Sequence, residues 1–503
     1  MAAKTIMVQG TTSGAGKSIL VTALCRIFKQ DGYKVAPFKS QNMALNSFVT
    51  RRGEEMGRSQ VVQAAAAGLE PSVDMNPILL KPEADSRCQV VLMGKPAMTL
   101  TAGEYGPLAD KLLPTVTEAL ERLRAAYDIV VIEGAGSPAE INIRQHEIVN
   151  MRIAKLAGAP VLLVGDIDRG GVFASLVGTL ALLDDSERSR IKGFIINKFR
   201  GEISLLQPGL DYLEKHTSRP VIGVIPYYRH IRIPEEDSID LGQEVISGQA
   251  DESLDIAIIH LPRLSNSTDF EPLQQEAGVR VRYVRTADEL GEPDAIILPG
   301  TKSTVADLEY LRRSGIAEMI IRQANRGTPT IGICGGFQMM GTQIKDPGGV
   351  ESAKDDIAGL GLLDVVTAFQ SEKTTRQVKA RVLGNEGLLA GLNGEEVTGY
   401  EIHMGQTPGS TRPLFRVTGN REGQAEYIDG VIAPGGFIFG SYLHGLFDNT
   451  NFRHAFLSGL RRRKGLPMIS EPSAINQEEQ FDALADVVRQ NLNMALVNKI
   501  CGL

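Results

Sequence analysis

The sequence has few cysteines and no long apolar run, and each shortage excludes a class of protein. The four cysteines, Cys25, Cys88, Cys334 and Cys501, lie far apart without a CxxC pair. This spacing indicates neither a zinc site nor a disulfide framework, and it favours a reduced, cytoplasmic thiol pool. No stretch approaches the roughly 20 apolar residues that a membrane span needs. The opening MAAKTIMVQG also lacks the apolar run and cleavage site of a signal peptide, so we expect a cytoplasmic protein without membrane contact.

Positive charge is not in excess either. Lysine and arginine number 53 against 60 aspartates and glutamates, a net charge of −7. No basic stripe or aromatic RNA-binding motif occurs, so we expect no nucleic-acid partner. The length of 503 residues predicts two or three domains, but the oligomeric state is not indicated.

Short apolar runs recur along the chain, each followed by a polar or glycine-rich turn and a helical pattern. The runs are β-branched and apolar on both faces, as buried parallel strands are. They cover residues 6–9, 35–38, 129–133, 161–164, 194–197 and 221–225 in the first half. Helices are expected at 17–29 and 147–156. The alternation predicts an α/β fold with a doubly wound parallel sheet.

A charged, turn-rich stretch then separates a second set of α/β runs from the first. Its strands are expected at 255–260, 279–284, 295–299, 330–333, 397–402 and 436–439. We therefore predict a phosphate-binding domain at 1–230, a linker at 231–252, a second α/β domain at 253–450 and a helical tail at 451–503.

The first expected strand is followed by a glycine-rich loop, G-T-T-S-G-A-G-K-S, at residues 10–18. Backbone N–H groups of such a loop cradle phosphate oxygens, a lysine reaches the β- and γ-phosphates, and a serine binds Mg²⁺. Thr11 stands where the usual motif has its first glycine. The strand–loop–helix context nevertheless predicts an ATP site, and its expected residues are Gly14, Ala15, Gly16, Lys17 and Ser18.

Two further strands end in carboxylates at the edge where ligands of open α/β sheets bind. Glu133 closes the apolar run 129–133, as the magnesium-binding acid of a Walker B strand does, and we expect Ser18 and Glu133 to hold Mg²⁺. Asp166 and Asp168 follow the run 161–164. They are candidates for metal or substrate contact, and a loop-stabilising role is the alternative.

The strongest catalytic signal is T-I-G-I-C-G-G-F-Q at residues 330–338. Cys334 lies in the G-x-nucleophile-x-G pattern of a nucleophile elbow, in which a strained turn exposes the nucleophile between a strand and a helix. The helix N-terminus favours the thiolate. Gly335 is expected to donate its N–H to an oxyanion, and a second donor is expected from Gly300 or Thr301 in the segment 298–303.

A thiolate of this kind needs a base, and His444 lies about a hundred residues after Cys334, just beyond the last expected strand. This order is similar to that of the triad class of glutamine amidotransferases. Those domains carry a glutamate two residues after the histidine, but Leu446 stands here. A Cys–His pair alone, or a carboxylate from elsewhere, would have to serve. His403 is the rival base, with a structural or substrate-facing role as its alternative.

An ATP site and a glutamine-hydrolysing thiol on one chain predict an amide synthetase. ATP would phosphorylate a substrate carboxylate, and ammonia released from L-glutamine would displace the phosphate. The segment E-G-A-G at 133–136 resembles dethiobiotin synthetase and its relatives, which activate carboxylates with ATP.

The ordered set of motifs resembles the cobyric acid synthase family over nearly the whole chain. The motifs that carry the resemblance lie at residues 10–18, 39–47, 75–82, 133–142, 166–171, 332–336, 399–405 and 441–447. The resemblance implies an N-terminal domain like dethiobiotin synthetase and a C-terminal class I-like glutamine amidotransferase domain. It also implies amidation of the b, d, e and g carboxylates of adenosylcobyrinic acid a,c-diamide to give adenosylcobyric acid, with one ATP and one glutamine for each amide.

Nothing in the composition indicates a corrin ring, so the substrate contacts are inferred from position alone. Asn42, Asn46 and Asn142 follow expected strand ends near the phosphate loop, and Asp166 and Asp168 share that edge. We expect these five residues to contact the corrinoid, with metal contact and ordinary loop structure as the alternatives. Two other functions compete with the synthetase: the sister cobyrinic acid a,c-diamide synthase, and a regulatory or partition ATPase with a degenerate amidotransferase module.

Overall fold

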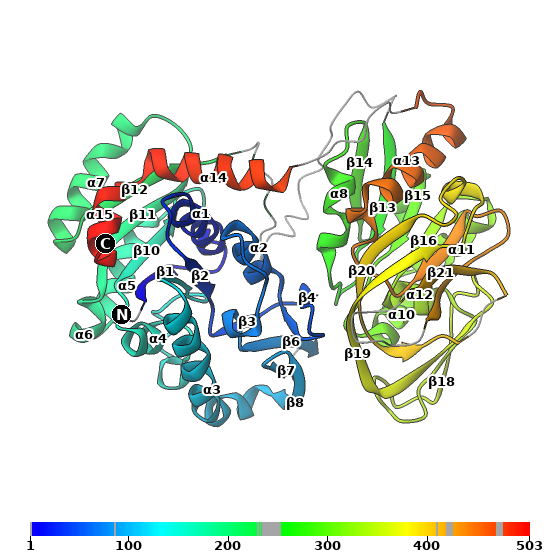
Figure 1. Ribbon diagram of the computed structural model, residues 1–503, viewed down its shortest axis with the longest axis horizontal. Coiled ribbons are helices and arrows are strands. Elements are labelled where there is room, and N and C mark those ends of the chain that lie inside the picture. The colour runs from blue at the N-terminus through cyan, green and yellow to red at the C-terminus, as the bar shows by residue number, and fades with distance from the viewer. Residues whose placement is uncertain are drawn as a thin grey trace. The chain divides into compact units, whose positions relative to one another are not determined.

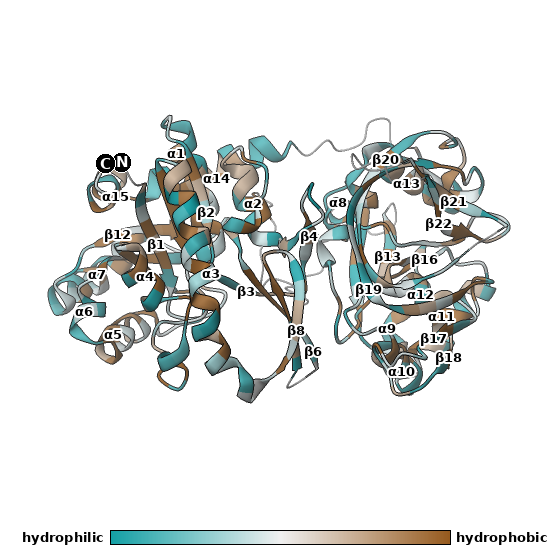
Figure 2. Cartoon of the chain, turned by 60° about the horizontal axis from the view of Figure 1, so that its bottom comes forward, coloured by the Kyte–Doolittle hydropathy of each residue, from teal (hydrophilic) through white to brown (hydrophobic). Residues whose placement is uncertain are grey.

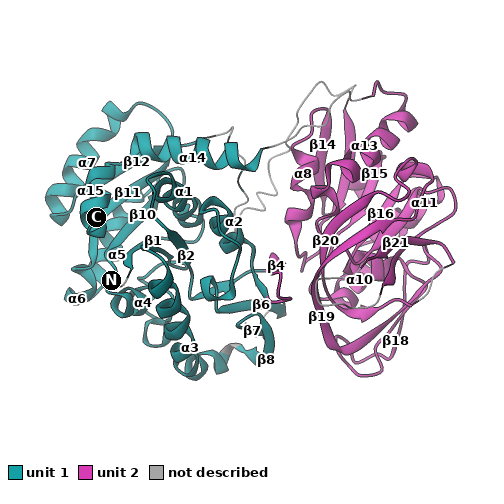
Figure 3. Ribbon diagram, in the orientation of Figure 1, with its two compact units in different colours: residues 1–44, 55–238, 476–503 teal, residues 45–54, 239–475 magenta. Residues whose placement is uncertain are grey.

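The computed structural model describes residues 3–84, 87–228, 231, 233, 253–408, 411–418, 426–468 and 476–503. The chain forms two compact units (Figure 3). Unit 1 comprises residues 1–44, 55–238 and 476–503, and unit 2 comprises 45–54 and 239–475. The expected linker at 231–252 lies outside the described residues, apart from residues 231 and 233.

The expected helical tail is divided between the units. Helix α13 (Thr450–Lys464) belongs to unit 2, whereas α14 (Gln477–Asn491) and α15 (Met494–Cys501) belong to unit 1. Arg26 of α1 (Lys17–Gln30) makes ion pairs of 2.7 Å with both Glu478 and Asp482 of α14. Helical periodicity predicts that the tail at 451–503 is amphipathic. The periodicity does not specify which unit the apolar side of each tail helix packs against.

Within the described residues, unit 1 is built on a six-stranded sheet in the order β12-β11-β10-β1-β9-β2, with parallel neighbours throughout (Figure 1). The strands are β1 (Lys4–Gly10), β2 (Val35–Phe38), β9 (Ile129–Glu133), β10 (Val161–Asp166), β11 (Ile191–Phe199) and β12 (Val221–Pro226). These are the expected strands, and the doubly wound parallel sheet is confirmed.

Alternate residues of the central strands face two separate apolar cores. Ile6 and Val8 pack with α1, α14 and α15 on one face, while Met7 packs on the other with α3 (Tyr105–Ala126), α4 (Met151–Ala157), α5 (Val172–Leu182) and α7 (Ile203–Thr217). Figure 2 shows apolar residues gathered on the strands and alternating with polar ones along α1. Strands covered on both faces in this way read as continuous apolar runs.

Helix α4 begins at Met151, four residues later than expected. The Glu147 carboxylate accepts hydrogen bonds from the backbone N–H groups of Val149, Asn150 and Arg152 (2.5–2.9 Å). A side chain that satisfies these donors from outside the helix favours a cap over another helical turn.

The remaining elements of unit 1 include a second, smaller sheet that the sequence reading did not identify. Its order is β3-β6-β7-β8. The bounds are β3 (Gln41–Met43), β5 (Glu55–Gly57), α2 (Arg58–Ala66), β6 (Ile78–Ala84), β7 (Arg87–Leu92), β8 (Lys95–Thr101) and α6 (Asp185–Arg188).

Unit 2 carries a mixed sheet whose parallel part has the order β14-β13-β15-β16-β23. These strands are β13 (Leu254–Ile259), β14 (Val279–Val284), β15 (Ala295–Leu298), β16 (Thr330–Ile333) and β23 (Ile438–Ser441). The helices are α8 (Glu271–Gln274), α9 (Ala287–Leu290), α10 (Thr304–Arg313), α11 (Ile316–Asn325) and α12 (Gly335–Met340).

A mostly antiparallel part extends this sheet. It comprises β17 (Gln343–Lys345), β18 (Asp356–Ala358), β19 (Val366–Val382), β20 (Glu396–Gln406), β21 (Pro413–Val417) and β22 (Tyr427–Ile432). One pair within it, between the strands β17 and β19, is parallel. Strand β4 (Ser47–Val49), from the segment 45–54, also belongs to this unit. The mixed α/β architecture that was expected for the second half is confirmed.

Candidate active sites

The glycine-rich loop lies between β1 and α1, and two of its glycines have left-handed backbones, Gly14 at φ 70° and Gly16 at φ 93°. A Cβ on Gly16 would lie 2.0 Å from Nδ2 of Asn197, which donates a 2.9 Å hydrogen bond to the Ala15 carbonyl. Lys198 donates a 2.8 Å bond to the Gly14 carbonyl. The end of β11 therefore holds the loop in the shape that directs backbone N–H groups to an anion.

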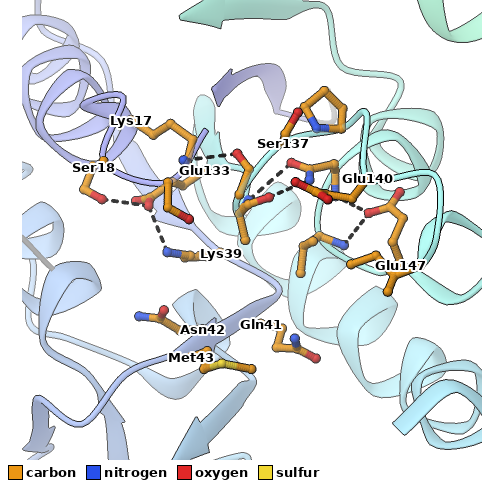
Figure 4. A pocket seen from close by; sticks show the side chains of 18 of the residues that line it. Lys17, Ser18, Lys39, Gln41, Asn42, Met43, Glu133, Ser137, Glu140 and Glu147 are labelled. Atoms are coloured by element: carbon orange, nitrogen blue, oxygen red, sulfur yellow. Dashed lines mark hydrogen bonds and ion pairs between the residues drawn. The ribbon is translucent and has the colours of Figure 1, made fainter. Parts of the chain in front are cut away.

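Lys17 and Ser18 open α1 on the side of the loop that faces Glu133 (Figure 4). Lys17 Nζ donates to the carbonyls of Thr12 (2.9 Å) and Gly136 (3.3 Å), so its ammonium is held across the loop. Ser18 Oγ donates to Glu133 Oε1 at 2.8 Å. The structure thus brings together the lysine, the serine and the strand-end carboxylate that the sequence reading selected.

Glu133 is buried, and three side chains surround its carboxylate. Besides Ser18, Lys39 Nζ lies 2.9 Å from Oε1 and Gln63 Nε2 donates to Oε2 at 2.5 Å. Burial opposes ionisation of Glu133, but the Lys39 ammonium and these hydrogen bonds outweigh it and lower the pKa of Glu133 below its ordinary value. A carboxylate that stays ionised beside a serine hydroxyl suits a divalent cation.

Ser18, Lys39 and Glu133 line a cavity of about 400 Å³. Its walls include Gly14, Gly16, Lys17, Ser18, Lys39, Gln41, Asn42, Met43, Glu133, Ser137, Glu140, Ile143, Arg144 and Glu147. The loop amides and Lys17 provide the positive field that a nucleotide triphosphate needs, and Ser18 with Glu133 provides oxygen donors for Mg²⁺. The residues present therefore fit a magnesium nucleotide.

The expected corrinoid contacts are not gathered at this cavity. Asn42 lines it, but the side chain is buried and donates to Gln60 Oε1 at 2.9 Å. Asn142 is exposed and is absent from the lining, and Asn46 belongs to unit 2.

Asp166 and Asp168 are also absent from the lining, and both make ion pairs. Asp166 pairs with Lys198 at 3.2 Å and accepts the N–H of Asp168 at 2.9 Å, while Asp168 pairs with Arg200 at 3.0 Å. These contacts favour the loop-stabilising role for both residues.

Cys334 lies on a strained turn between β16 and α12, with φ 51° and ψ −109°. A Cβ on Gly332 would meet Phe337 N at 2.7 Å, and one on Gly336 would meet the Leu298 carbonyl oxygen at 2.0 Å. Strand, turn and helix can pack this closely only without these side chains, which is the physical reason for the G-x-C-x-G pattern.

The loop after β15 lies against this elbow. A Cβ on Gly335 would be 3.1 Å from the backbone nitrogen of Thr301, and one on Gly300 would be 3.0 Å from Cε1 of His444. The two segments that were expected to supply oxyanion donors are therefore neighbours of each other and of the histidine.

His444 is buried and pairs with both Cys334 and a carboxylate. Its ring donates from Nδ1 to Asp269 Oδ2 at 2.6 Å, and its other side forms a hydrogen bond with the Cys334 thiol. Burial alone would lower the pKa of His444, but the charges of Asp269 and Cys334 outweigh it and raise that pKa to about 10. The site thus favours the protonated form of His444.

Asp269 supplies the carboxylate that is missing after the histidine, where Leu446 stands. It lies in the short helix η5 (Ser267–Phe270), and its Oδ1 also accepts the N–H of Gly445 at 3.1 Å. The sequence reading missed this residue, although it follows the end of β13 at the edge of the sheet that carries the thiol. The signal available was an aspartate in a polar turn after an apolar strand.

His403 stacks on Tyr442 with ring centroids 3.9 Å apart, and it does not take the place of His444. Its Nδ1 donates to the Gly405 carbonyl at 2.7 Å, and burial lowers the pKa of His403, so the ring is neutral and Nε2 is an acceptor. That buried Nε2 has no hydrogen-bond partner. Because Ile402, the residue before it, accepts from Cys334 Sγ at 3.6 Å, this geometry favours the substrate-facing role.

Comparison with known families defines the class of protein. Residues 6–240 match the family described as the CobQ/CobB/MinD/ParA nucleotide binding domain, and residues 255–452 match the CobB/CobQ-like glutamine amidotransferase domain. The chain therefore joins a nucleotide-binding domain to a glutamine amidotransferase domain. Within the described residues, no helix combines the length and apolar character needed to cross a membrane.

Similarity to relatives over the full length narrows this class. The chain is 57% identical to a cobyric acid synthase of Dehalococcoides mccartyi over 99% of this chain and 97% of the relative. It is 52% identical to one of Sorangium cellulosum (100% and 99%) and 51% identical to one of Pelotomaculum thermopropionicum (100% and 97%). The chain belongs to the cobyric acid synthase family, and it is a ligase that takes its amide nitrogen from glutamine.

Proposed function

We propose that this chain converts adenosylcobyrinic acid a,c-diamide into adenosylcobyric acid by amidating the b, d, e and g carboxylates with glutamine and ATP–Mg²⁺ in the cytoplasm. One observation carries the proposal. A single chain holds a buried Cys334–His444–Asp269 group and a phosphate loop in which Ser18 meets the ionised Glu133. The similarity to cobyric acid synthases extends over nearly the full length of both chains, and this supports the choice of substrate.

Ammonia is released at the thiol site. The Cys334 thiolate attacks the γ-carboxamide carbon of glutamine, and backbone N–H groups of Gly335 and of Gly300 or Thr301 stabilise the oxyanion. The His444 imidazolium gives its proton to the departing nitrogen, so ammonia leaves and a γ-glutamyl thioester remains. His444 then takes a proton from water as it attacks the thioester, and glutamate leaves. Asp269 keeps the ring in the required tautomer throughout.

The carboxylate is activated at the phosphate loop. A corrinoid carboxylate oxygen attacks the γ-phosphorus of ATP and ADP leaves, which gives an acyl phosphate. Ammonia attacks the acyl carbon, phosphate leaves, and the amide loses one proton. Loop amides and Lys17 neutralise the charge on the phosphoryl group. Ser18 and Glu133 would hold Mg²⁺, which supplies further charge neutralisation when bound.

We propose that the corrinoid lies against the exposed apolar side chains beside the nucleotide cavity. Met43 and Ile143 line the cavity yet are 60% and 56% exposed, and Ile141, two residues before Ile143 in the sequence, is 65% exposed. Large apolar side chains exposed together at the mouth of a polar cavity suit the apolar body of a macrocycle. Its carboxylate arms would then reach Lys17.

Mass spectrometry of the corrinoid product tests the proposed function. Incubation with ATP, Mg²⁺ and glutamine labelled with ¹⁵N at the amide should yield a product that carries four labelled amides. Efficient amidation of cobyrinic acid at a and c would instead favour the sister diamide synthase. ATP hydrolysis with neither glutaminase activity nor any amidated corrinoid would favour a regulatory ATPase.

A further inference from the structure

The segment 45–54 leaves the nucleotide-binding part of the sequence and packs within unit 2. It begins two residues after β3, whose residues Gln41, Asn42 and Met43 line the nucleotide cavity. It lies inside the 6–240 family match and far from the amidotransferase match, which begins at residue 255. Several of its residues nevertheless contact the surroundings of His444.

The first contact is with the short helix that carries Asp269. Helix η5 begins at Ser267, and its preceding residue, Asn266, makes no side-chain bond to cap it. Instead, Asn46 Oδ1 accepts the Ser267 N–H at 3.0 Å and lies 3.3 Å from Ser267 Oγ. The first N–H groups of a helix have no partner within it, so Asn46 supplies a capping oxygen from 221 residues away.

The bond is reciprocated. Asn266 is buried in the left-handed region at φ 55°, and its Oδ1 accepts the N–H of Ser47 at 3.0 Å. Each asparagine side chain thus accepts the backbone N–H of the residue that follows the other asparagine, at the turn that positions Asp269. Each bond restricts the conformation of the turn before Asp269, whose carboxylate must point at Nδ1 of His444.

The second contact is with the ring that stacks on His444. The Phe48 and Tyr400 rings lie 5.4 Å apart, and Tyr400 stacks on His444 at 5.3 Å with an interplanar angle of 17°. Gln377 Nε2 donates to the Val49 carbonyl at 2.9 Å, which fastens the segment to β19. The segment therefore supports both the acid and one face of the histidine ring.

We propose that Asn46 is a positioning residue of the glutaminase site. It acts through Ser267 and Asp269 to orient His444. The sequence had instead predicted that Asn46 contacts the corrinoid. The glutaminase site is therefore completed by a residue from the nucleotide-binding part of the sequence. The inference rests on the proposed roles of Cys334 and His444.

Asn46→Ala in the full chain removes the capping oxygen, and Asn46→Asp retains it. The kcat for glutamine hydrolysis should fall about tenfold in Asn46→Ala with little change in KM, since loss of one orienting hydrogen bond is expected to have this effect. Asn46→Asp should recover most of the rate. Amidation fed by ammonium should keep its rate and its KM for the corrinoid. Arg52→Ala, a change of an exposed side chain in the same segment, is the matched control.

Thermal melting of the same preparations separates positioning from unfolding. A lower kcat at an unchanged melting temperature, restored by Asn46→Asp, supports the inference. Wild-type glutaminase activity in Asn46→Ala would overturn it. So would a raised corrinoid KM in the ammonium-fed reaction, which would restore Asn46 as a substrate contact. Glutaminase activity surviving in Cys334→Ala would instead overturn the proposed function, so the two failures are distinguishable.

Discussion

The Nδ1 of His444 lies 2.6 Å from Oδ2 of Asp269, and both side chains are buried. A charge-assisted bond this short, removed from water, orients the ring and stabilises its protonated form. Asp269→Asn should therefore lower the kcat for glutamine hydrolysis by about 10²- to 10⁴-fold, the range seen when triad carboxylates are neutralised. Steady-state glutaminase assays check this result.

Ammonium-fed amidation serves as the internal control for this variant, because it bypasses the thiol site. It should remain at the wild-type rate. A loss of less than threefold in the glutaminase reaction would mean that Cys334 and His444 work as a pair without Asp269.

The raised pKa of His444 predicts how stability depends on pH. A histidine whose pKa rises from about 6.5 in the unfolded chain to about 10 in the fold stabilises the fold fully below pH 6.5. That contribution is lost as the pH rises through 10. The melting temperature of the amidotransferase unit should therefore fall between pH 7 and 10, and it should fall less steeply in Asp269→Asn. Calorimetry across this range checks it, and equal slopes would contradict the assignment.

The close approach of the elbow to β15 predicts a large packing penalty at Gly336. Because a Cβ there would lie 2.0 Å from the Leu298 carbonyl oxygen, Gly336→Ala should destabilise unit 2 by about 2 kcal/mol or more and abolish glutaminase activity. Gly178→Ala in α5 is the control, since a Cβ there meets no atom within 4 Å and alanine favours helices. Denaturant titration of both variants measures the difference. Equal stability of the two variants would argue against this elbow geometry.

The exposed apolar side chains beside the nucleotide cavity predict a selective effect on corrinoid binding. Met43→Ser combined with Ile143→Ser should raise the KM for the corrinoid about tenfold or more and leave the KM for ATP and the glutaminase rate unchanged. Leu205→Ser, which changes an 82% exposed side chain of α7, is the control. An unchanged corrinoid KM would place the macrocycle elsewhere.

Much of the fold could be predicted because buried strands and tight loops each require particular residue types at adjacent positions. A strand buried on both faces is an apolar run, and the loops around Lys17 and Cys334 need glycine where backbone atoms approach closely. These local demands leave a pattern in a few adjacent residues, so the parallel strands of both units and both loops could be identified from the sequence.

The rest depends on contacts between distant parts of the chain. Asp269 reaches His444 across 175 residues, and Asn46 reaches Ser267 across 221, so neither pairing leaves a local pattern. The antiparallel part of unit 2 and the sheet β3-β6-β7-β8 have half-exposed strands with weak apolar runs, which is why they were largely missed. Asn142, Asp166 and Asp168 were selected by proximity to strand ends, which does not specify where a side chain points.

In the proposed reaction a thiol frees the nitrogen at one site and a phosphorylated carboxylate captures it at another. Amidation of the corrinoid by Cys334→Ala and by Lys17→Ala, each supplied first with glutamine and then with ammonium, tests it most directly. We expect Cys334→Ala to fail with glutamine but to work with ammonium, whereas Lys17→Ala should fail with both. Equal failure of the two variants with ammonium, or amidation by Cys334→Ala from glutamine, would contradict it.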